Sequence, residues 1–190
     1  NYSFGKNRLG NPDVIKLLGT ELNFQVIVCP QILIHDQIVS SSIIRECIIS
    51  GNVSKACELL GRPYQIVGKV VHGEKRGRII GFPTANLQTD FSLLPKNGIY
   101  ATISKIDNKY YHSVTHIGPR PTFQNNIPVI ETYVLDQNFD IYDQTMDVCF
   151  IQWIRDLEKF DSIESLKQAI ASDVERARKI LSEESCLAEL

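Results

Sequence analysis

The sequence has no excess of charge of either sign and no long hydrophobic run. Its 190 residues include 20 Lys and Arg against 22 Asp and Glu, a formal net charge of -2, so composition offers no overall basic field for nucleic acid. The longest apolar runs, such as FQVIVCPQILI, are too short and too interrupted to span a membrane. We therefore expect neither nucleic acid nor a membrane as a partner, and a small molecule as the default ligand.

Cysteine pairs in metal-binding or redox spacing are also missing. No CxxC occurs, which argues against a zinc site and against a disulfide framework. An odd number of cysteines, in a chain whose start does not resemble a targeting peptide, is typical of reduced thiols, so we expect a cytoplasmic protein. The chain begins at Asn1 rather than Met, and we expect that something upstream is missing. The five scattered cysteines are Cys29, Cys47, Cys57, Cys149 and Cys186.

Three common catalytic signatures are absent as well. The sequence contains no GxxxxGK[ST], so it has no P-loop, and no Ser-His-Asp arrangement is recognisable from sequence order. His72, His112 and His116 show no ligand-type spacing with cysteines or carboxylates, and we assign none of them to a metal. Phosphate, if it is bound, must be held by another kind of loop.

The N-terminal part shows one strand-like run followed by a helical pattern. FQVIVCP, at Phe24–Pro30, predicts a strand because it is rich in apolar and β-branched residues. Ser40 or Ser41 is expected to cap a helix that ends at Gly51.

A second helix is expected to follow at once. Apolar residues at helical spacing predict it over residues 53–60, with Gly61 after its last turn. Pro63 prevents the helix from continuing. We therefore divide the chain into a domain over residues 1–62 and another over residues 63–190.

After Tyr64 the hydrophobic period becomes that of strands. Two of the segments are joined only by Asp107 and Asn108, which predicts a tight hairpin. Five or six short strands with no helices between them predict a small antiparallel barrel, because closure removes exposed edges. The segments, rich in β-branched and aromatic residues, are YQIVGKVV, GIYATISKI, KYYHSVTHIG, VIETYVLD and MDVCFIQWI.

The end of the chain has the pattern of one long amphipathic helix. Asp161 with Glu164 predicts a capping box at its start. We expect its apolar stripe to pack on the barrel. The stripe consists of Ile163, Leu166, Ile170, Val174, Ala177 and Leu181.

The segment GKVVHGEKRGRIIGFPTAN combines glycines and cations with small polar side chains. Its glycines allow close approach of the backbone to a ligand, and its cations favour phosphate. A solvated glycine-rich hairpin with a basic surface explains the same composition. Thr84 and Asn86 are two residues apart in an extended segment, so both can face one side and offer oxygens that suit Mg²⁺. Local turn hydrogen bonds after Pro83 are the alternative.

Other polar groups have two interpretations each. Glu131 lies in an apolar and aromatic strand, so it is either on a solvated face or a general base in a cleft. Arg155 binds an anion or an aromatic ligand, or forms a surface salt bridge with Asp156 or Glu158. The run SSS with Arg45 offers an anion site at a helix N-terminus or simple N-capping.

Taken together, these motifs resemble the riboflavin kinase family from Pro63 to about Leu181. GKVVHGEKRGRIIGFPTANL is similar to the family's glycine-rich loop and PTAN signature, and IGPRPTF to a later turn motif. VIETYVLD is similar to the strand that bears the catalytic glutamate, and IRDLEKFDSIESLKQAIASDVERAR to the closing segment and helix. The resemblance implies a mainly β fold, a six-stranded Greek-key barrel with a long C-terminal helix.

The same resemblance implies an activity and a set of site residues. It implies that ATP gives its γ-phosphate to the ribityl 5′-hydroxyl of riboflavin, which yields FMN. Glu131 is implied as general base, Thr84 and Asn86 as ligands of Mg²⁺ or another divalent cation, and Arg155 with Glu131 as flavin-binding. The implied ATP site consists of Gly68, Lys69, His72, Gly73, Gly77, Gly81, Pro83 and Thr84.

The first 62 residues resemble the end of the adenylyltransferase domain that precedes the kinase in bacterial bifunctional FAD synthetases. NYSFGKNRLG is similar to that family's DFRFGKGRxG segment, and SSSIIR to its ISSTxIR helix. This implies a remnant of a Rossmann-like α/β nucleotidyltransferase domain, with Ser41, Ser42 and Arg45 as nucleotide contacts. The family's HxGH motif has no counterpart here, and Tyr133 stands where a His is common.

Other functions stay open at this point. An FMN adenylyltransferase, which makes FAD from FMN and ATP, needs the residues that precede Asn1 in the family. A non-catalytic flavin-binding module would bind without turnover, and Thr84, Asn86 and Glu131 together argue against it. A nucleic-acid-binding barrel has only the basic loop in its favour. No feature of the sequence predicts an oligomeric state.

Overall fold

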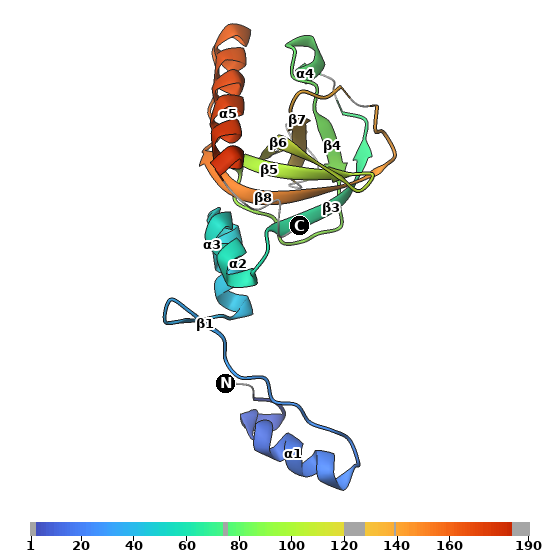
Figure 1. Cartoon of the computed structure of the whole chain (residues 1–190), viewed down its shortest axis with the longest axis vertical. Helices are drawn as coiled ribbons and strands as arrows, with labels where there is room; N and C mark the ends of the chain where they lie inside the picture. Colours follow the sequence, from blue (N-terminus) through green and yellow to red (C-terminus); the bar gives the residue numbers. More distant parts are fainter. Residues whose placement is uncertain (1–2, 74–75, 120–127, 139, 184–190) are drawn as a thin grey trace. The chain divides into compact units, whose positions relative to one another are not determined.

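The computed structural model describes residues 3–73, 76–119, 128–138 and 140–183 (Figure 1). Packing divides the chain into two compact units, Asn1–Val39 and Ser40–Leu190. The expected turn motif IGPRPTF lies outside the described residues beyond Pro119, as does Cys186. No helix in the described ranges has the length and apolar character needed to cross a membrane.

The first unit contains few regular elements. A short 3-10 turn, η1 (Lys6–Arg8), precedes the helix α1 (Pro12–Glu21). Asn11 caps α1, because its side-chain oxygen accepts from two backbone N–H groups at 3.0 Å. A hairpin of β1 (Leu33–Ile34) and β2 (Gln37–Ile38) follows.

The predicted strand at Phe24–Pro30 is wrong. Its residues belong to no regular element, and none of the strands in the described ranges pairs with them. A strand needs backbone hydrogen bonds to a neighbour, and an apolar, β-branched composition supplies none of these by itself. Ile27 and Val28 are consequently exposed, at 76% and 48%.

Both helices predicted for the next stretch are confirmed. Ser40 caps α2 (Ser41–Ser50) by accepting from a backbone N–H at 3.4 Å. The second helix is α3 (Val53–Leu60). Gly51 and Gly61 end the two helices with φ of 86° and 68°, the left-handed region that glycine adopts without strain.

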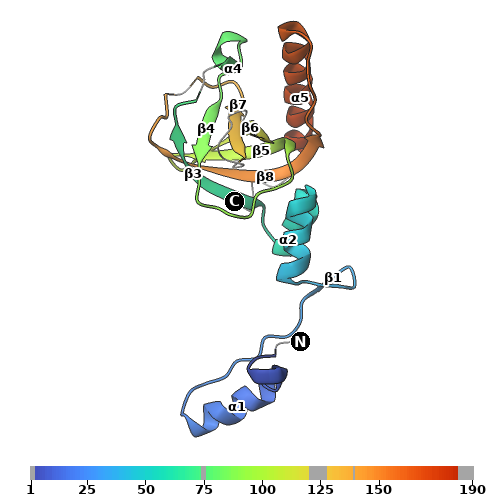
Figure 2. The same cartoon turned by 180° about the vertical axis from the view of Figure 1, so that it is seen from behind.

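These two helices belong to the same compact unit as the barrel. α3 contacts the strands β3 and β8, and its Val53 belongs to the core inside the barrel. Figure 1 shows α2 and α3 below the barrel on the side of α5, and Figure 2 shows α2 there from behind. The packing division thus falls between Val39 and Ser40. A domain boundary after Arg62 stays a prediction.

The predicted six-stranded antiparallel barrel is confirmed. The strands close in the order β3-β4-β7-β6-β5-β8. The barrel is therefore not a simple meander, because β4 pairs with β7 and β5 pairs with β8. The hairpin at Asp107 and Asn108 is also confirmed, with φ of 48° and 60°. The strands are β3 (Tyr64–Val71), β4 (Ala85–Gln88), β5 (Gly98–Ile106), β6 (Lys109–Gly118), β7 (Val129–Val134) and β8 (Thr145–Arg155).

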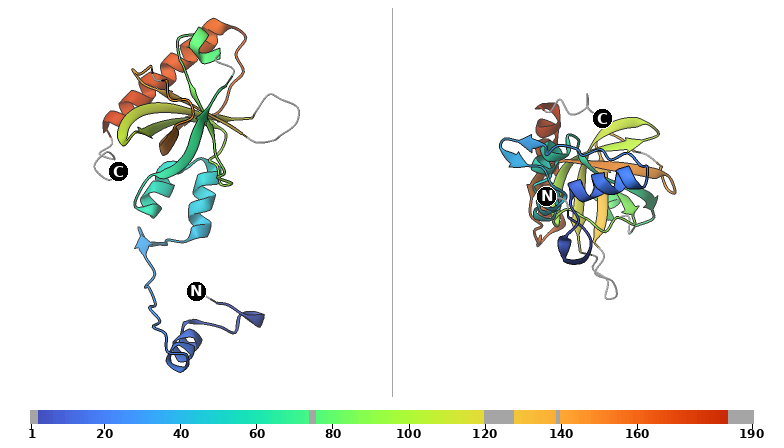
Figure 3. Two further views of the ribbon diagram at one scale, coloured as in Figure 1. Left: turned by 90° about the vertical axis from the view of Figure 1, so that its right-hand side faces the viewer. Right: turned by 90° about the horizontal axis from the view of Figure 1, so that it is seen from below.

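Strand alternation gives the barrel wall two apolar faces. The inner face holds a core that includes Tyr100, Ile117 and Phe150. The outer face of β5, β6 and β8 is covered by α5 (Ile163–Glu183), which buries Val174 and Ala177 against it. Figure 3 shows α5 lying along the barrel wall. The predicted packing of the C-terminal helix is therefore confirmed.

The cap of α5 differs from the prediction. The hydroxyl of Ser162 accepts from the backbone N–H of Ser165 at 3.0 Å, and the hydroxyl of Ser165 accepts from the backbone N–H of Ser162 at 3.3 Å. The capping box is therefore Ser162 with Ser165, not Asp161 with Glu164. The helix begins one residue later than expected, which places a serine rather than Asp161 at the capping position.

Candidate functional site

The glycine-rich segment is only partly a loop. Gly68 and Lys69 lie inside β3, which corrects the expectation that the loop begins there. Lys69 forms an ion pair with Asp143 at 2.7 Å, and this hydrogen bond holds the pKa of the Asp143 carboxyl below its usual value. Further along, the short helix α4 (Arg76–Ile79) replaces the expected open loop.

Two glycines of this segment lie against the polar pair of the PTAN motif. A Cβ added at Gly73 would come within 2.2 Å of the side-chain amide nitrogen of Asn86. A Cβ at Gly77 would lie 2.3 Å from the carbonyl oxygen of Phe82 and 3.4 Å from Oγ1 of Thr84. Only glycine fits at these places without a shift of the neighbouring groups. The segment therefore covers Thr84 and Asn86 closely.

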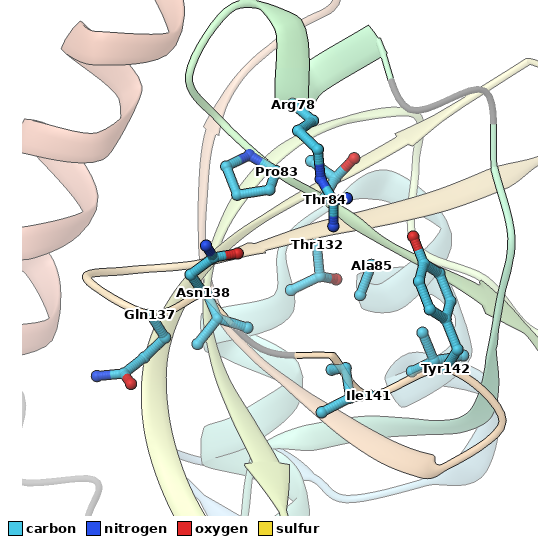
Figure 4. A pocket seen from close by; sticks show the side chains of 11 residues that line it. Arg78, Pro83, Thr84, Ala85, Thr132, Gln137, Asn138, Ile141 and Tyr142 are labelled. Atoms are coloured by element: carbon cyan, nitrogen blue, oxygen red, sulfur yellow. The ribbon is translucent and has the colours of Figure 1, made fainter.

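A pocket at the end of the barrel contains Thr84 (Figure 4). Its volume is about 40 Å³, and Arg78 of α4, Thr132 of β7 and Tyr142 also line it. The ring of His72 stacks on Tyr142, with 3.9 Å between centroids. One water molecule needs about 10 to 15 Å³ of such cavity space, so this part of the site has room for a few water molecules or a small polar group.

The strand register places the other candidate residues in one row on the outer face of the barrel. Asn86 on β4 is directly opposite Glu131 on β7, and Glu131 is directly opposite His116 on β6. His116 is opposite Ile99, which is in turn opposite Arg155 on β8. Residues opposite each other across antiparallel strands have Cβ atoms about 5 Å apart. The barrel thus brings together three residues that are far apart in sequence: Asn86, Glu131 and Arg155.

His116 and Glu131 are close neighbours in this row. Nδ1 of His116 lies 3.7 Å from Oε2 of Glu131, and the two side chains are 34% and 38% exposed. Burial, and secondarily the positive charge of Arg155, lower the pKa of His116 below its ordinary value of 6.5. The imidazole is therefore neutral at pH 7.

Arg155 is held by a partner that the sequence did not indicate. Its guanidinium donates two hydrogen bonds to the carboxylate of Asp173 on α5, at 2.8 and 2.7 Å. The expected partners contribute less: Glu158 is 3.7 Å away, and Asp156 accepts only through its backbone carbonyl. The hydrogen bonds to Asp173 raise the pKa of Arg155. This pair fixes a cation beside the polar row.

The family model described as "Flavokinase: Riboflavin kinase" matches residues 60–181. The chain belongs to the riboflavin kinase family. The match begins near the predicted boundary at residue 62 and covers the whole barrel and most of α5.

Known relatives align with almost the full chain. The bifunctional riboflavin kinase/FMN adenylyltransferase of Buchnera aphidicola subsp. Schizaphis graminum is 34% identical over 182 residues, which are 94% of this chain and 58% of that protein. The protein of the same description from Haemophilus influenzae is 35% identical over 178 residues, which are 93% and 58% of the two chains. The chain thus spans about 58% of the length of these relatives.

A solved structure has the same fold over nearly the same residues. It is described as the crystal structure of a macrolide-efflux protein from Streptococcus pneumoniae, and it is 35% identical to this chain with a TM-score of 0.82. The alignment covers 94% of this chain and 58% of that one.

Within this riboflavin kinase fold, the remaining predicted residues lie apart from the row. Ser41, Ser42 and Arg45 are exposed on α2. Gly81 adopts φ of 92° after α4, and Pro83 lines the pocket beside Thr84. Thr84 itself precedes β4, so the pocket and the outer row meet at the start of that strand.

Two residues of this candidate site, His116 and Asp173, were not predicted from the sequence. His116 has no metal-ligand spacing in the sequence, and its neighbour Glu131 comes from a different strand. Asp173 interrupts the apolar stripe of α5 directly before Val174, and a buried acid on a helix is a usable signal for a cation opposite it. Only the strand register and the packing of α5 identify this cation as Arg155.

Proposed function

We propose that this chain is an ATP-dependent riboflavin kinase, which transfers the γ-phosphate of ATP to the 5′-hydroxyl of riboflavin and releases FMN. The observation that carries the proposal is the pairing of Asn86 with Glu131 across β4 and β7, under the segment that contains Gly73, in a chain of the riboflavin kinase family. This arrangement sets a carboxylate beside an amide oxygen and a close-fitting glycine segment. Phosphoryl transfer depends mainly on such positioning of groups.

Each polar group has a role in this proposal. Glu131 accepts the proton of the ribityl hydroxyl as that oxygen attacks the γ-phosphorus. Arg155, held by Asp173, binds the flavin beside α5. The nucleotide is held by residues of β3 and of the segment that follows it: Gly68, Lys69, His72, Gly73, Gly77, Gly81, Pro83 and Thr84.

A divalent cation fits the residues that the structure provides. Thr84 offers a hydroxyl and Asn86 an amide oxygen, both neutral and hard donors of the kind that Mg²⁺ accepts beside water and phosphate oxygens. Within the described ranges no group of three His, Cys, Asp or Glu side chains is arranged to hold a metal instead. Bound Mg²⁺ would supply charge neutralisation at the phosphates.

The test is to incubate the chain with riboflavin, ATP and Mg²⁺ and to separate the flavins by chromatography. FMN that requires all three components supports the kinase. Riboflavin binding without FMN would replace the proposal with a flavin-binding module. Glu131→Gln, which keeps the size of the side chain, serves as the matched control and should yield little FMN.

FMN adenylyltransferase activity is a second candidate, for the longer protein. It is favoured by the relatives, which are described as bifunctional and align with 94% and 93% of this chain. On this proposal residues 1–62 are the end of the adenylyltransferase domain, with Ser41, Ser42 and Arg45 as nucleotide contacts. FAD in the same chromatogram would support it. We also propose a cytoplasmic location, which the scattered cysteines without CxxC spacing in the sequence favour.

A further inference from the structure

The imidazole of His116 has one nitrogen whose role the fold does not explain. Nδ1 is buried, and none of the described residues forms a hydrogen bond with it. A buried polar atom without a partner destabilises the fold and is unusual unless it has a function. The closest opposite charge is Oε2 of Glu131, 3.7 Å away.

The surroundings of the ring restrict how it can turn. Gly118, two residues along β6 on the same face, lies under the ring: a Cβ there would be 2.5 Å from Nε2 of His116. That same Cβ would lie 3.1 Å from the side chain of Leu157. Because the Nε2 edge is packed in this way, Nδ1 is the nitrogen that faces β7.

The charged groups around the ring keep it neutral. Glu131 faces it from β7 and Arg155 from β8, while its partner on β5 is the apolar Ile99. Burial and the Arg155 guanidinium both lower the pKa of His116. A neutral imidazole has one N–H donor, and a carboxylate only accepts, so the stable arrangement at this contact carries the proton on Nδ1.

We propose that His116 is a positioning residue, which donates its Nδ1–H to Oε2 of Glu131 and so orients the other carboxylate oxygen toward the substrate hydroxyl. This inference rests on the proposed riboflavin kinase activity. A shortening of the 3.7 Å contact by less than 1 Å makes the hydrogen bond, and such contacts commonly tighten when substrate binds.

The test compares kcat and KM of the full chain with three variants at position 116. His116→Ala should lower kcat about tenfold, the low end of the effect of losing an outer partner of a catalytic group, with both KM values nearly unchanged. His116→Asn should restore most of kcat, because its amide nitrogen occupies the place of Nδ1. His116→Gln places the amide one carbon further away and should not.

Two controls separate this role from a structural one. His112→Ala changes a half-buried histidine on the same strand and face, and should leave kcat as it is. In a Glu131→Ala background, His116→Ala should cause no further loss, because a positioning residue acts only through its partner. Full kcat in His116→Ala, or the same tenfold loss with and without Glu131, would overturn the inference. A wild-type chain that makes no FMN would overturn the proposed function and this inference with it.

Discussion

Arg155 and Asp173 form an ion pair at the interface between β8 and α5. Their side chains are only 16% and 4% exposed, and two short hydrogen bonds connect them. Such a pair contributes little net stability relative to an apolar pair, but the loss of one partner leaves a buried charge without compensation. The pair therefore links the fold of α5 to the position of a cation in the site.

We expect Asp173→Ala to lower the free energy of unfolding by about 3 kcal/mol, the low end for breaking a buried ion pair. Denaturant unfolding followed by circular dichroism measures this change. Asp136→Asn is the matched control. It removes the charge of an exposed pair with Arg178 of α5, keeps a residue type that tolerates the φ of 58° at this position, and should leave the unfolding midpoint nearly unchanged. Equal effects of the two variants would contradict the assignment.

Glu131→Ala tests the general base. Turnover should fall by about 100-fold or more, because the reaction loses its general base. The affinities for riboflavin and ATP should stay within about twofold, because Glu131 is only one of the proposed contacts to the flavin. Single-turnover FMN formation and fluorescence titration of riboflavin measure the two effects. Glu164→Ala, an exposed acid on α5, is the control. Near-normal turnover in Glu131→Ala would remove this residue from the role.

The titration of His116 predicts a pH dependence of stability. Its pKa is lowered in the folded chain, so the unfolded chain binds this proton more readily, near the ordinary pKa of 6.5. The free energy of unfolding therefore rises with pH between the two pKa values, and stability is lost as the pH falls below about 6.5. Melting curves of the wild type and His116→Asn should converge as the pH is lowered. A constant difference in Tm would contradict this.

At the scale of elements, described residues of the segment between β3 and β4 lie close to the PTAN side chains. Its short helix α4 and its glycines lie over the start of β4, and the backbone at Gly73 leaves no room for a side chain beside Asn86. The other half of the site is built from β6, β7 and β8, which the barrel register aligns. The site thus lies between a covering segment and a rigid wall.

Asn86→Ala and Gly73→Ala should both weaken the use of Mg²⁺. The first removes a ligand oxygen, and the second displaces the Asn86 side chain or the segment that covers it. We expect the Mg²⁺ concentration for half-maximal FMN formation to rise about tenfold in Asn86→Ala and a few-fold in Gly73→Ala. The affinity for riboflavin should stay unchanged in both variants. A Mg²⁺ titration at fixed ATP measures this. An unaltered metal dependence of Asn86→Ala would count against its assignment.

At the scale of the whole molecule, the kinase candidates and both cores lie in the unit from Ser40 to Leu190. The first unit, Asn1–Val39, exposes many large apolar side chains, including Leu17 at 66% and Leu22 at 68%. The helices α2 and α3 belong to the larger unit, where Val53 is fully buried in the barrel core. The predicted domain boundary and the packing boundary thus differ by the length of these two helices.

Two shortened chains distinguish these boundaries. A chain of residues 40–190 should keep a cooperative melt and form FMN, because it retains both cores. A chain of residues 63–190 should melt at a lower temperature, since it loses α3 with Val53 and uncovers the core residues that Val53 packs against. Thermal melting and FMN formation measure both. Equal stability of the two chains would show that α3 contributes nothing to the barrel.

Elements that depend on local interactions were predicted correctly from the sequence, and an element that needs a distant partner was not. The hairpin at Asp107 and Asn108, the strands around it and the helices ended by Gly51 and Gly61 were predicted correctly, because each depends on local turn and capping chemistry. The strand at Phe24–Pro30 was wrong, because composition cannot supply a hydrogen-bonding neighbour. The candidate roles of Glu131 and Asn86 came from motifs and still depend on the experiments above.

The sequence by itself determined the family, the barrel with its C-terminal helix, and the residue types of the site. These follow from short motifs and from periodic patterns that local interactions impose. Only the tertiary structure decided that Asn86, Glu131, His116 and Arg155 form one row, and that Asp173 holds Arg155. The physical reason is that strand register and helix packing depend on the closure of the whole barrel, which joins residues far apart in sequence.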